Sequence, residues 1–184
     1  MLGGDPRGRT GQGGDTRISD SRFDMSINGN GLNIDMPCGA FMGMINVANC
    51  TTQRNGGNGF YVHSSQGEMK PAPVYLANCT AEGDGINLSN NAAYRLSGPV
   101  AVSMLNCSSH VCTPDAPDGC PLYAIVTTSG GIAPPVMVDI RGGFYNAVTA
   151  FSNAIDNPLT SNVSAYAYIG KQWNKQQPKL VTSL

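Results

Sequence analysis

Apolar and polar residues alternate in short runs along this chain, and one of these runs is repeated. The pattern apolar-x-apolar-x-Asn-Cys occurs as INVANC at 45–50, as VYLANC at 74–79 and as VSMLNC at 102–107. A period of two places successive side chains on opposite faces of a strand. Each copy therefore predicts a short strand with one inward face.

Weaker copies extend the repeat in both directions. TRISDS puts Ser21 at the Cys position, VDIRGG puts Gly143 there, and YAYIGK puts Lys171 there. From Ser21 to Lys171 the intervals are then 29, 29, 28, 36 and 28 residues, and the longest contains the insertion CTPDAPDGCP at 112–121. A nearly constant interval of this length indicates stacked coils, each of which buries its apolar side chains against its neighbours.

The residue before each of these positions is Asp, Asn or Gly, the types that best tolerate a left-handed backbone. This column predicts a backbone corner whose asparagines are mostly buried and stacked. The small residue after the corner then points inward again, so the cysteines form a column of small apolar side chains. The predicted structural ladder consists of Asn49, Asn78, Asn106, Cys50, Cys79 and Cys107.

Further strands are predicted after the corners. Four of them begin with Gly or Leu and alternate: GLNI at 31–34, GFYV at 59–62, GINL at 85–88 and LYAIV at 122–126. A weaker pattern, AAYRL at 92–96, predicts a third short strand in its coil. No stretch shows the sustained 3.6-residue periodicity of a helix.

INVANC, VYLANC and VSMLNC, with the strands that follow them, resemble the coils of the right-handed parallel β-helix of the pectate-lyase-like superfamily. The resemblance is strongest to bacteriophage tailspikes and related virion proteins. It implies an all-β solenoid of about six coils, each about 29 residues long, over residues 15–172. Residues 1–14 then form a Gly/Arg-rich N-terminal arm, and residues 173–184 form a C-terminal tail.

Composition excludes several classes of protein. Charged residues make up 12% of the 184 residues and the net charge is −1, which argues against a nucleic-acid partner. No run of about 18 apolar residues exists, so no membrane insertion is expected. The N-terminus lacks the apolar region of a secretory signal, so the thiols are expected to be free, with a Cys112–Cys120 disulfide as the alternative. Without a CxxC motif, neither a metal nor another cofactor is expected.

The candidate catalytic residues are weak. Glu82 and Asp84 in AEGDG have the spacing for the two carboxylates of a glycosidase, although Gly-flanked acids are more often solvated turn residues. Asp139 and Arg141 fit a surface ion pair better than a lyase site. His63 and His110 have no orienting partner nearby in sequence.

These observations favour a non-enzymatic structural or recognition component of a virus particle, such as a tailspike, a fibre or a capsid-decorating protein, located in the virion after synthesis in the host cytoplasm. The second hypothesis is a polysaccharide-cleaving lyase or glycosidase. The third is a glycan-binding module. Its candidate stacking residues for a host-surface glycan are Tyr61, Tyr75, Tyr94 and Trp173.

The outward strand position before each corner predicts a partner surface. Its six residues are Ser19, Ala48, Ala77, Leu105, Arg141 and Ile169. Four of the six are apolar, and an apolar stripe on a solenoid surface favours self-association through Ala48, Ala77, Leu105 and Ile169. The resemblance to viral β-helices implies a homotrimer. The basic start of the chain, with Arg7, Arg9, Arg17 and Arg22, is a candidate for docking on other virion proteins.

Overall fold

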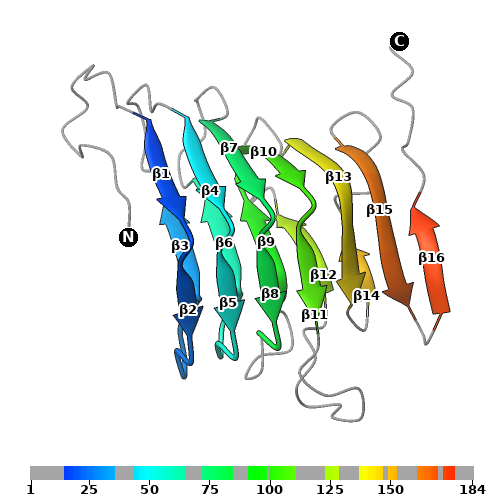
Figure 1. The fold of residues 1–184 in the computed structure, drawn as a ribbon, viewed down its shortest axis with the longest axis horizontal. Coiled ribbons are helices and arrows are strands. Elements are labelled where there is room, and N and C mark those ends of the chain that lie inside the picture. The colour runs from blue at the N-terminus through cyan, green and yellow to red at the C-terminus, as the bar shows by residue number, and fades with distance from the viewer. Residues whose placement is uncertain are drawn as a thin grey trace.

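The structure, a computed structural model, describes residues 15–35, 44–64, 72–84, 91–98, 100–110, 123–128, 137–146, 149–152, 161–169 and 172–176. Every regular element in these ranges is a β-strand (Figure 1). The strands are β1 Thr16–Ser19, β2 Arg22–Asp24, β3 Leu32–Asp35, β4 Ile45–Ala48, β5 Thr51–Gln53, β6 Phe60–His63, β7 Ala72–Ala77, β8 Thr80–Glu82, β9 Ala92–Ser97, β10 Val100–Leu105, β11 Ser108–His110, β12 Tyr123–Thr128, β13 Met137–Asn146, β14 Thr149–Ser152, β15 Ser161–Ile169 and β16 Gln172–Gln176.

Strands from successive repeats pair in parallel and form three rows. Row 1 contains β1, β4, β7, β10, β13 and β15; row 2 contains β2, β5, β8 and β11; row 3 contains β3, β6, β9, β12 and β14. The long strand β13 pairs with β10 near its start and with β11 near its end, which joins rows 1 and 2 into one sheet. The chain is therefore an all-β protein of stacked parallel sheets, an arrangement compatible with a β-solenoid (Figure 1).

The pairing register in row 1 follows the sequence repeat. The paired inward residues are Thr16, Ile45, Val74, Val102 and Val138. Their intervals of 29, 29, 28 and 36 residues equal those of the repeat. The loop insertion at 112–121 thus lengthens a connection and leaves the strand register unchanged.

The last copy of the repeat is placed differently. Val138 pairs with Ser161, five positions before the predicted partner Tyr166, which instead pairs with Phe144. The prediction was wrong because the nine-residue strand β15 pairs with β13 on both sides of the irregularity between Arg141 and Phe144, so Tyr166 lies opposite the second part of β13. β15 also pairs antiparallel with β16, which includes residues 173–176 of the predicted tail.

Row 3 also differs from its prediction. GLNI, GFYV and LYAIV fall in β3, β6 and β12, but the strand that pairs with β6 is β9, formed by AAYRL. GINL lies outside the described residues. AAYRL is therefore the repeat of GFYV, and the weaker pattern was the correct one for this row.

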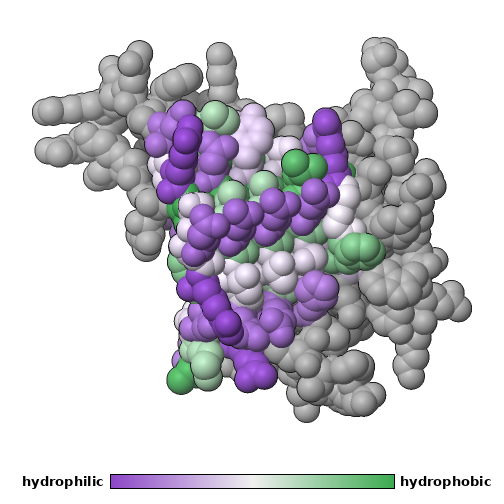
Figure 2. Space-filling view, in the orientation of Figure 1, coloured by the Kyte–Doolittle hydropathy of each residue, from purple (hydrophilic) through white to green (hydrophobic). Residues whose placement is uncertain are grey.

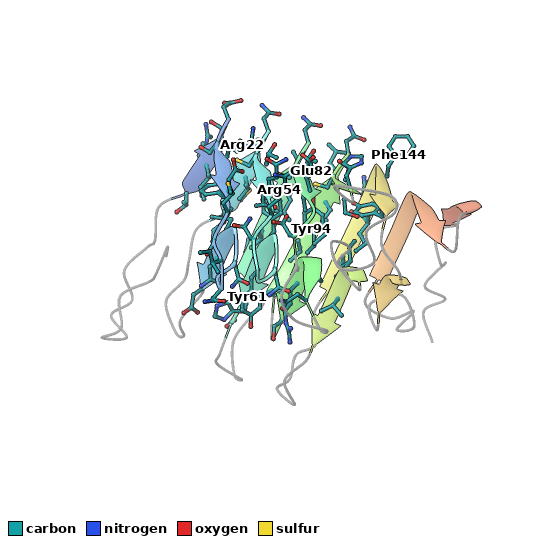
Figure 3. The ribbon with its side chains drawn as sticks, turned by 90° about the horizontal axis from the view of Figure 1, so that it is seen from below. Arg22, Arg54, Tyr61, Glu82, Tyr94 and Phe144 are labelled. Carbon is teal, nitrogen blue, oxygen red and sulfur yellow. The ribbon has the colours of Figure 1, made fainter. Side chains whose placement is uncertain are left out.

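The three rows enclose one hydrophobic core. In the strands whose side chains the structure describes, alternate residues face inward, and the buried side chains stack on those of the neighbouring repeat. Phe60 and Tyr94 stack with ring centroids 5.1 Å apart, and the Tyr94 hydroxyl lies 2.8 Å from the carbonyl oxygens of Cys79 and Ser108. Tyr94 is fully buried between the rows (Figure 3), so its predicted role as a glycan platform is wrong.

Candidate functional site

Asn49, Asn78 and Asn106 have φ values of 54°, 51° and 50°, the left-handed conformation that the sequence predicts. The Asn78 amide donates to Asn49 Oδ1 at 3.2 Å, and the Asn49 amide donates to Asp20 Oδ1 at 3.1 Å. The prediction that these asparagines are mostly buried was wrong, because all three are exposed. The column lies on the outside of the corner, where its side chains bond to one another.

Cys50, Cys79 and Cys107 are free and buried. The Cys79 thiol donates to the Val47 and Ala77 carbonyl oxygens at 3.6 and 3.4 Å. The Cys107 thiol donates to the Leu76 carbonyl oxygen at 3.4 Å, and burial raises the pKa of Cys50. The thiols therefore line the core. Cys112 and Cys120 lie outside the described residues.

Glu82 and Asp84, the candidate carboxylate pair, lie in different environments. Glu82 ends β8 and lies on the outer side of row 2, in register with Gln53 and His110 (Figure 3). Asp84 follows the left-handed Gly83 and is fully buried. This arrangement does not provide the two substrate-facing carboxylates that a glycosidase needs.

The buried Asp84 carboxylate is bonded to the preceding repeat. Its Oδ2 accepts from the Thr52 hydroxyl at 2.6 Å, and its Oδ1 accepts from the Asn55 backbone N–H at 2.9 Å and the Asn55 amide at 2.8 Å. Burial raises the pKa of Asp84, and these hydrogen bonds oppose the increase. The carboxylate holds the turn that begins at Arg54 against the next repeat.

Sequence reasoning missed this second ladder, although the repeat contains its signal. Ser26, Asn55 and Asp84 each lie five residues after their repeat position, at intervals of 29 and 29. The Ser26 backbone N–H donates to Asn55 Oδ1 at 3.0 Å, which continues the ladder. A second left-handed corner at Met25, Arg54 and Gly83 precedes it and was also missed.

The outer side of row 3 carries a cluster of polar and aromatic side chains that is the candidate functional site. We call it the row-3 face, and it consists of Asn33, Asp35, Tyr61, His63, Arg95 and Ser97. All six residues are partly exposed. Tyr61 projects on the opposite side of the structure from Arg22 and Glu82 (Figure 3).

The side chains of the row-3 face contact one another. The rings of Tyr61 and His63 stack with centroids 4.3 Å apart, and the Arg95 guanidinium lies 5.8 Å from the Tyr61 centroid. His63 Nδ1 is 3.6 Å from Asp35 Oδ1. No partner for His63 could be predicted from the sequence, because Asp35 is 28 residues away and only the pairing of β3 with β6 brings the two together.

Two side-chain oxygens of this face are buried without a hydrogen bond: Asn33 Oδ1 and Asp35 Oδ1. Buried polar atoms in native proteins normally have a partner, and the exceptions are often functional. The row-3 face therefore combines acceptor oxygens, an imidazole and a cation stacked on an aromatic ring, which suits it to bind a polar ligand.

The structure contains only part of the column of outward residues that was predicted as a partner surface. Ser19, Ala48, Ala77, Leu105 and Arg141 do form one column on row 1. The next residue in that column is Ser164, and Ile169 pairs with Gln172 instead, so its place in the stripe was wrong. Leu105 is 48% exposed, and the nearby outward residue Tyr75 is 43% exposed.

The other sequence candidates divide as follows. Arg141 and Asp139 form the predicted surface pair at 2.8 Å, and Arg22 forms an ion pair with Asp24. Trp173 lies in β16, but its side chain lies outside the described part of the structure. Residues 1–14, the predicted N-terminal arm, also lie outside it. Among the described residues, no group of three or more His, Cys, Asp or Glu could hold a metal ion, and none lies in a helix that could span a membrane.

Comparison with known proteins finds no matching family model, no similar curated protein and no similar solved structure.

Proposed function

We propose that this chain is a structural and recognition protein of a virus particle, built as a right-handed parallel β-helix of about six coils of about 29 residues. The resemblance to tailspike coils suggests the particle, and the register of row 1 supports the coil length. In this proposal the chain displays flat outer sheet faces, and it does not cleave polysaccharide chains.

The observation that carries the proposal is that the Asp84 carboxylate is buried and bonded within the core. This carboxylate accepts hydrogen bonds from Thr52 and Asn55 inside the core, which leaves Glu82 without a second substrate-facing carboxylate in that turn. The carboxylate that argued most for a polysaccharide-cleaving enzyme thus stabilises the coil stack, and this favours display over chain cleavage.

The recognition surface in this proposal is the row-3 face. The Tyr61 ring is stacked on His63 with the Arg95 guanidinium over it, so Tyr61 offers its ring edge and hydroxyl, and Asp35 and Asn33 offer polar groups beside them. A host-surface glycan presents apolar sugar faces and many hydroxyl groups, and it fits such a mixed surface. Tyr75 lies on row 1, a different face, so it would belong to a separate contact.

Self-association in this proposal uses row 1. Ala48, Ala77 and Leu105 form a column of apolar side chains, and bands of like hydropathy cross the strands on the surface in Figure 2. Burying such a stripe against two other copies would give a homotrimer, whose closed symmetry avoids open-ended growth. The N-terminal arm would then dock on other virion proteins.

Mass spectrometry of purified particles tests the location. We expect the chain in a fixed ratio to the other virion proteins, and its absence from particles would overturn the proposal. A glycan array tests recognition with the wild type and with Tyr61→Ala, and Tyr75→Ala is the matched control. Binding that Tyr61→Ala abolishes supports the row-3 face, whereas depolymerisation of a bound polysaccharide would favour the enzyme hypothesis.

A further inference from the structure

We propose that Asp35, His63 and Ser97 on the row-3 face form a serine-nucleophile site that hydrolyses carboxylic esters. This activity goes beyond recognition. The three residues end the adjacent strands β3, β6 and β9, and the register pairs Asp35 with His63 and His63 with Ser97. An acid, an imidazole and a hydroxyl thus follow one another in a single column across the sheet, in the order that a catalytic triad uses.

Asp35 orients the imidazole. Its Oδ1 is buried without a hydrogen bond, and it lies 3.6 Å from His63 Nδ1. A movement of a few tenths of an ångström would complete a hydrogen bond, and such bonds are often long before substrate binds. The carboxylate keeps the proton on Nδ1, so Nε2, on the far side of the ring from β3, remains an acceptor. Stacking on Tyr61 restrains the ring.

Ser97 is held at a sharp turn. It is the last residue of β9, and Gly98 follows it with φ 76°. A Cβ added to Gly98 would come within 2.1 Å of the Ser64 carbonyl oxygen, so only glycine fits there. The Ser64 N–H donates to the Ser97 carbonyl oxygen at 3.0 Å, which fixes the main chain of Ser97 beside His63.

The reaction follows from these positions. The Ser97 oxygen attacks the ester carbonyl carbon while its proton moves to His63 Nε2, and the tetrahedral intermediate then breaks the bond to the alcohol oxygen, which takes that proton. Water then attacks the acyl carbon while its proton moves to His63 Nε2, and the bond between the acyl carbon and the Ser97 oxygen breaks. The imidazolium returns the proton to the Ser97 oxygen, which releases the carboxylic acid and restores the free enzyme. The donors nearest in the chain for the oxyanion are the Gly98 backbone N–H and the Arg95 side chain, which shares the outer side of β9.

A fluorophosphonate probe and p-nitrophenyl acetate test the site on the full chain. We expect the probe to label Ser97, as shown by peptide mass spectrometry, and the Ser97→Ala and His63→Gln variants to hydrolyse the acetate at least about 100-fold more slowly. Ser103→Ala, an outward serine of row 1, is the matched control and should keep the wild-type rate.

Asp35→Asn tests the positioning role, with Asp24→Asn as its control. We expect Asp35→Asn to lower kcat by at least about 100-fold with little change in KM, because the imidazole would lose its orientation. Absence of label on Ser97, or hydrolysis unchanged in Ser97→Ala, would overturn the proposal, and glycan binding by Ser97→Ala would leave the recognition function standing.

Discussion

Replacement of Asp84 by Ala removes a carboxylate that three buried donors share. These donors are the Thr52 hydroxyl, the Asn55 backbone N–H and the Asn55 amide, at 2.6, 2.9 and 2.8 Å. A buried donor left without its acceptor costs about 1–3 kcal/mol. Three such losses, partly relieved by water that enters the space left by the carboxylate, give an expected destabilisation of about 3–5 kcal/mol.

The Asp84→Asn variant separates hydrogen bonding from charge. Its amide oxygen can still accept from Asn55, and the Thr52 hydroxyl can rotate to accept from the new amide, since a hydroxyl both donates and accepts. The expected cost at neutral pH is therefore less than about 1 kcal/mol. Urea denaturation followed by circular dichroism measures both variants. For a slope of about 2 kcal/mol per molar, Asp84→Ala should lower the midpoint by about 1.5–2.5 M.

Protonation of Asp84 gives the same prediction a second test. Its folded-state pKa is raised above the ordinary value of 3.8, so the folded state binds the proton more tightly than the unfolded state does. The contribution of this group to stability is therefore complete below the unfolded pKa and is lost as the pH rises through the folded pKa. The Asp84→Asn variant has no carboxyl group at this position, so it does not lose stability in this way as the pH rises. Its stability relative to the wild type should therefore be higher at about pH 7 than at about pH 3.

Asp24→Asn is the control for these measurements. Asp24 is an exposed carboxylate paired with Arg22, and such a surface pair contributes about 0–1 kcal/mol. The reasoning would be refuted if Asp84→Ala unfolded within about 0.5 kcal/mol of the wild type, or if the Asp24 and Asp84 variants behaved alike.

Other substitutions test the corners, the core and the partner surface. Asn78→Val should cost about 1–3 kcal/mol in urea denaturation, because a β-branched residue is strained at φ 51°, whereas Asn78→Gly should cost less. Gly143→Ala should cost at least about 2 kcal/mol, since its Cβ would meet the Cys107 carbonyl oxygen at 1.8 Å; an equally stable variant would contradict this corner. The three ladder cysteines should resist iodoacetamide in native buffer, and fast labelling of Cys79 would mean that the core is open. Leu105→Glu should dissociate the proposed homotrimer without unfolding the chain, and light scattering that shows a monomer for both proteins would exclude the proposed interface.

Local features of the fold could be predicted because they depend on nearby residues. The alternation in INVANC and VYLANC specifies a strand and its inward side, and the Asn at the corner reflects a conformation that few residue types adopt. The exposure of the same asparagines could not be predicted, because it depends on which side of the corner the neighbouring repeats lie. A left-handed backbone is equally compatible with a buried and an exposed side chain.

The burial of Asp84 could not be predicted from its neighbours in the sequence. In sequence it is an acid between two glycines, which is typical of a solvated turn. Its burial follows from the stacking of Asn55 beneath it, and the two residues are 29 positions apart. Only a column-by-column alignment of the turns, carried five residues beyond each cysteine, would have shown that Asp84 continues a line of hydrogen-bonding residues.

The sequence by itself determined the row-1 strands up to β13, their inward faces, the first left-handed corner of each repeat and the intervals at which these strands pair, because period, residue size and backbone tolerance are local properties. The row-2 strands and the second left-handed corner became evident only in the structure. The tertiary structure decided which residues meet across the sheet. Asp35, His63 and Ser97 are separated by 28 and 34 residues, and these unequal intervals conceal their common column. Connections of different length join the strands, and hydrogen bonding between strands fixes the register whatever the length of the connection, so the row-3 face exists only after the chain has folded.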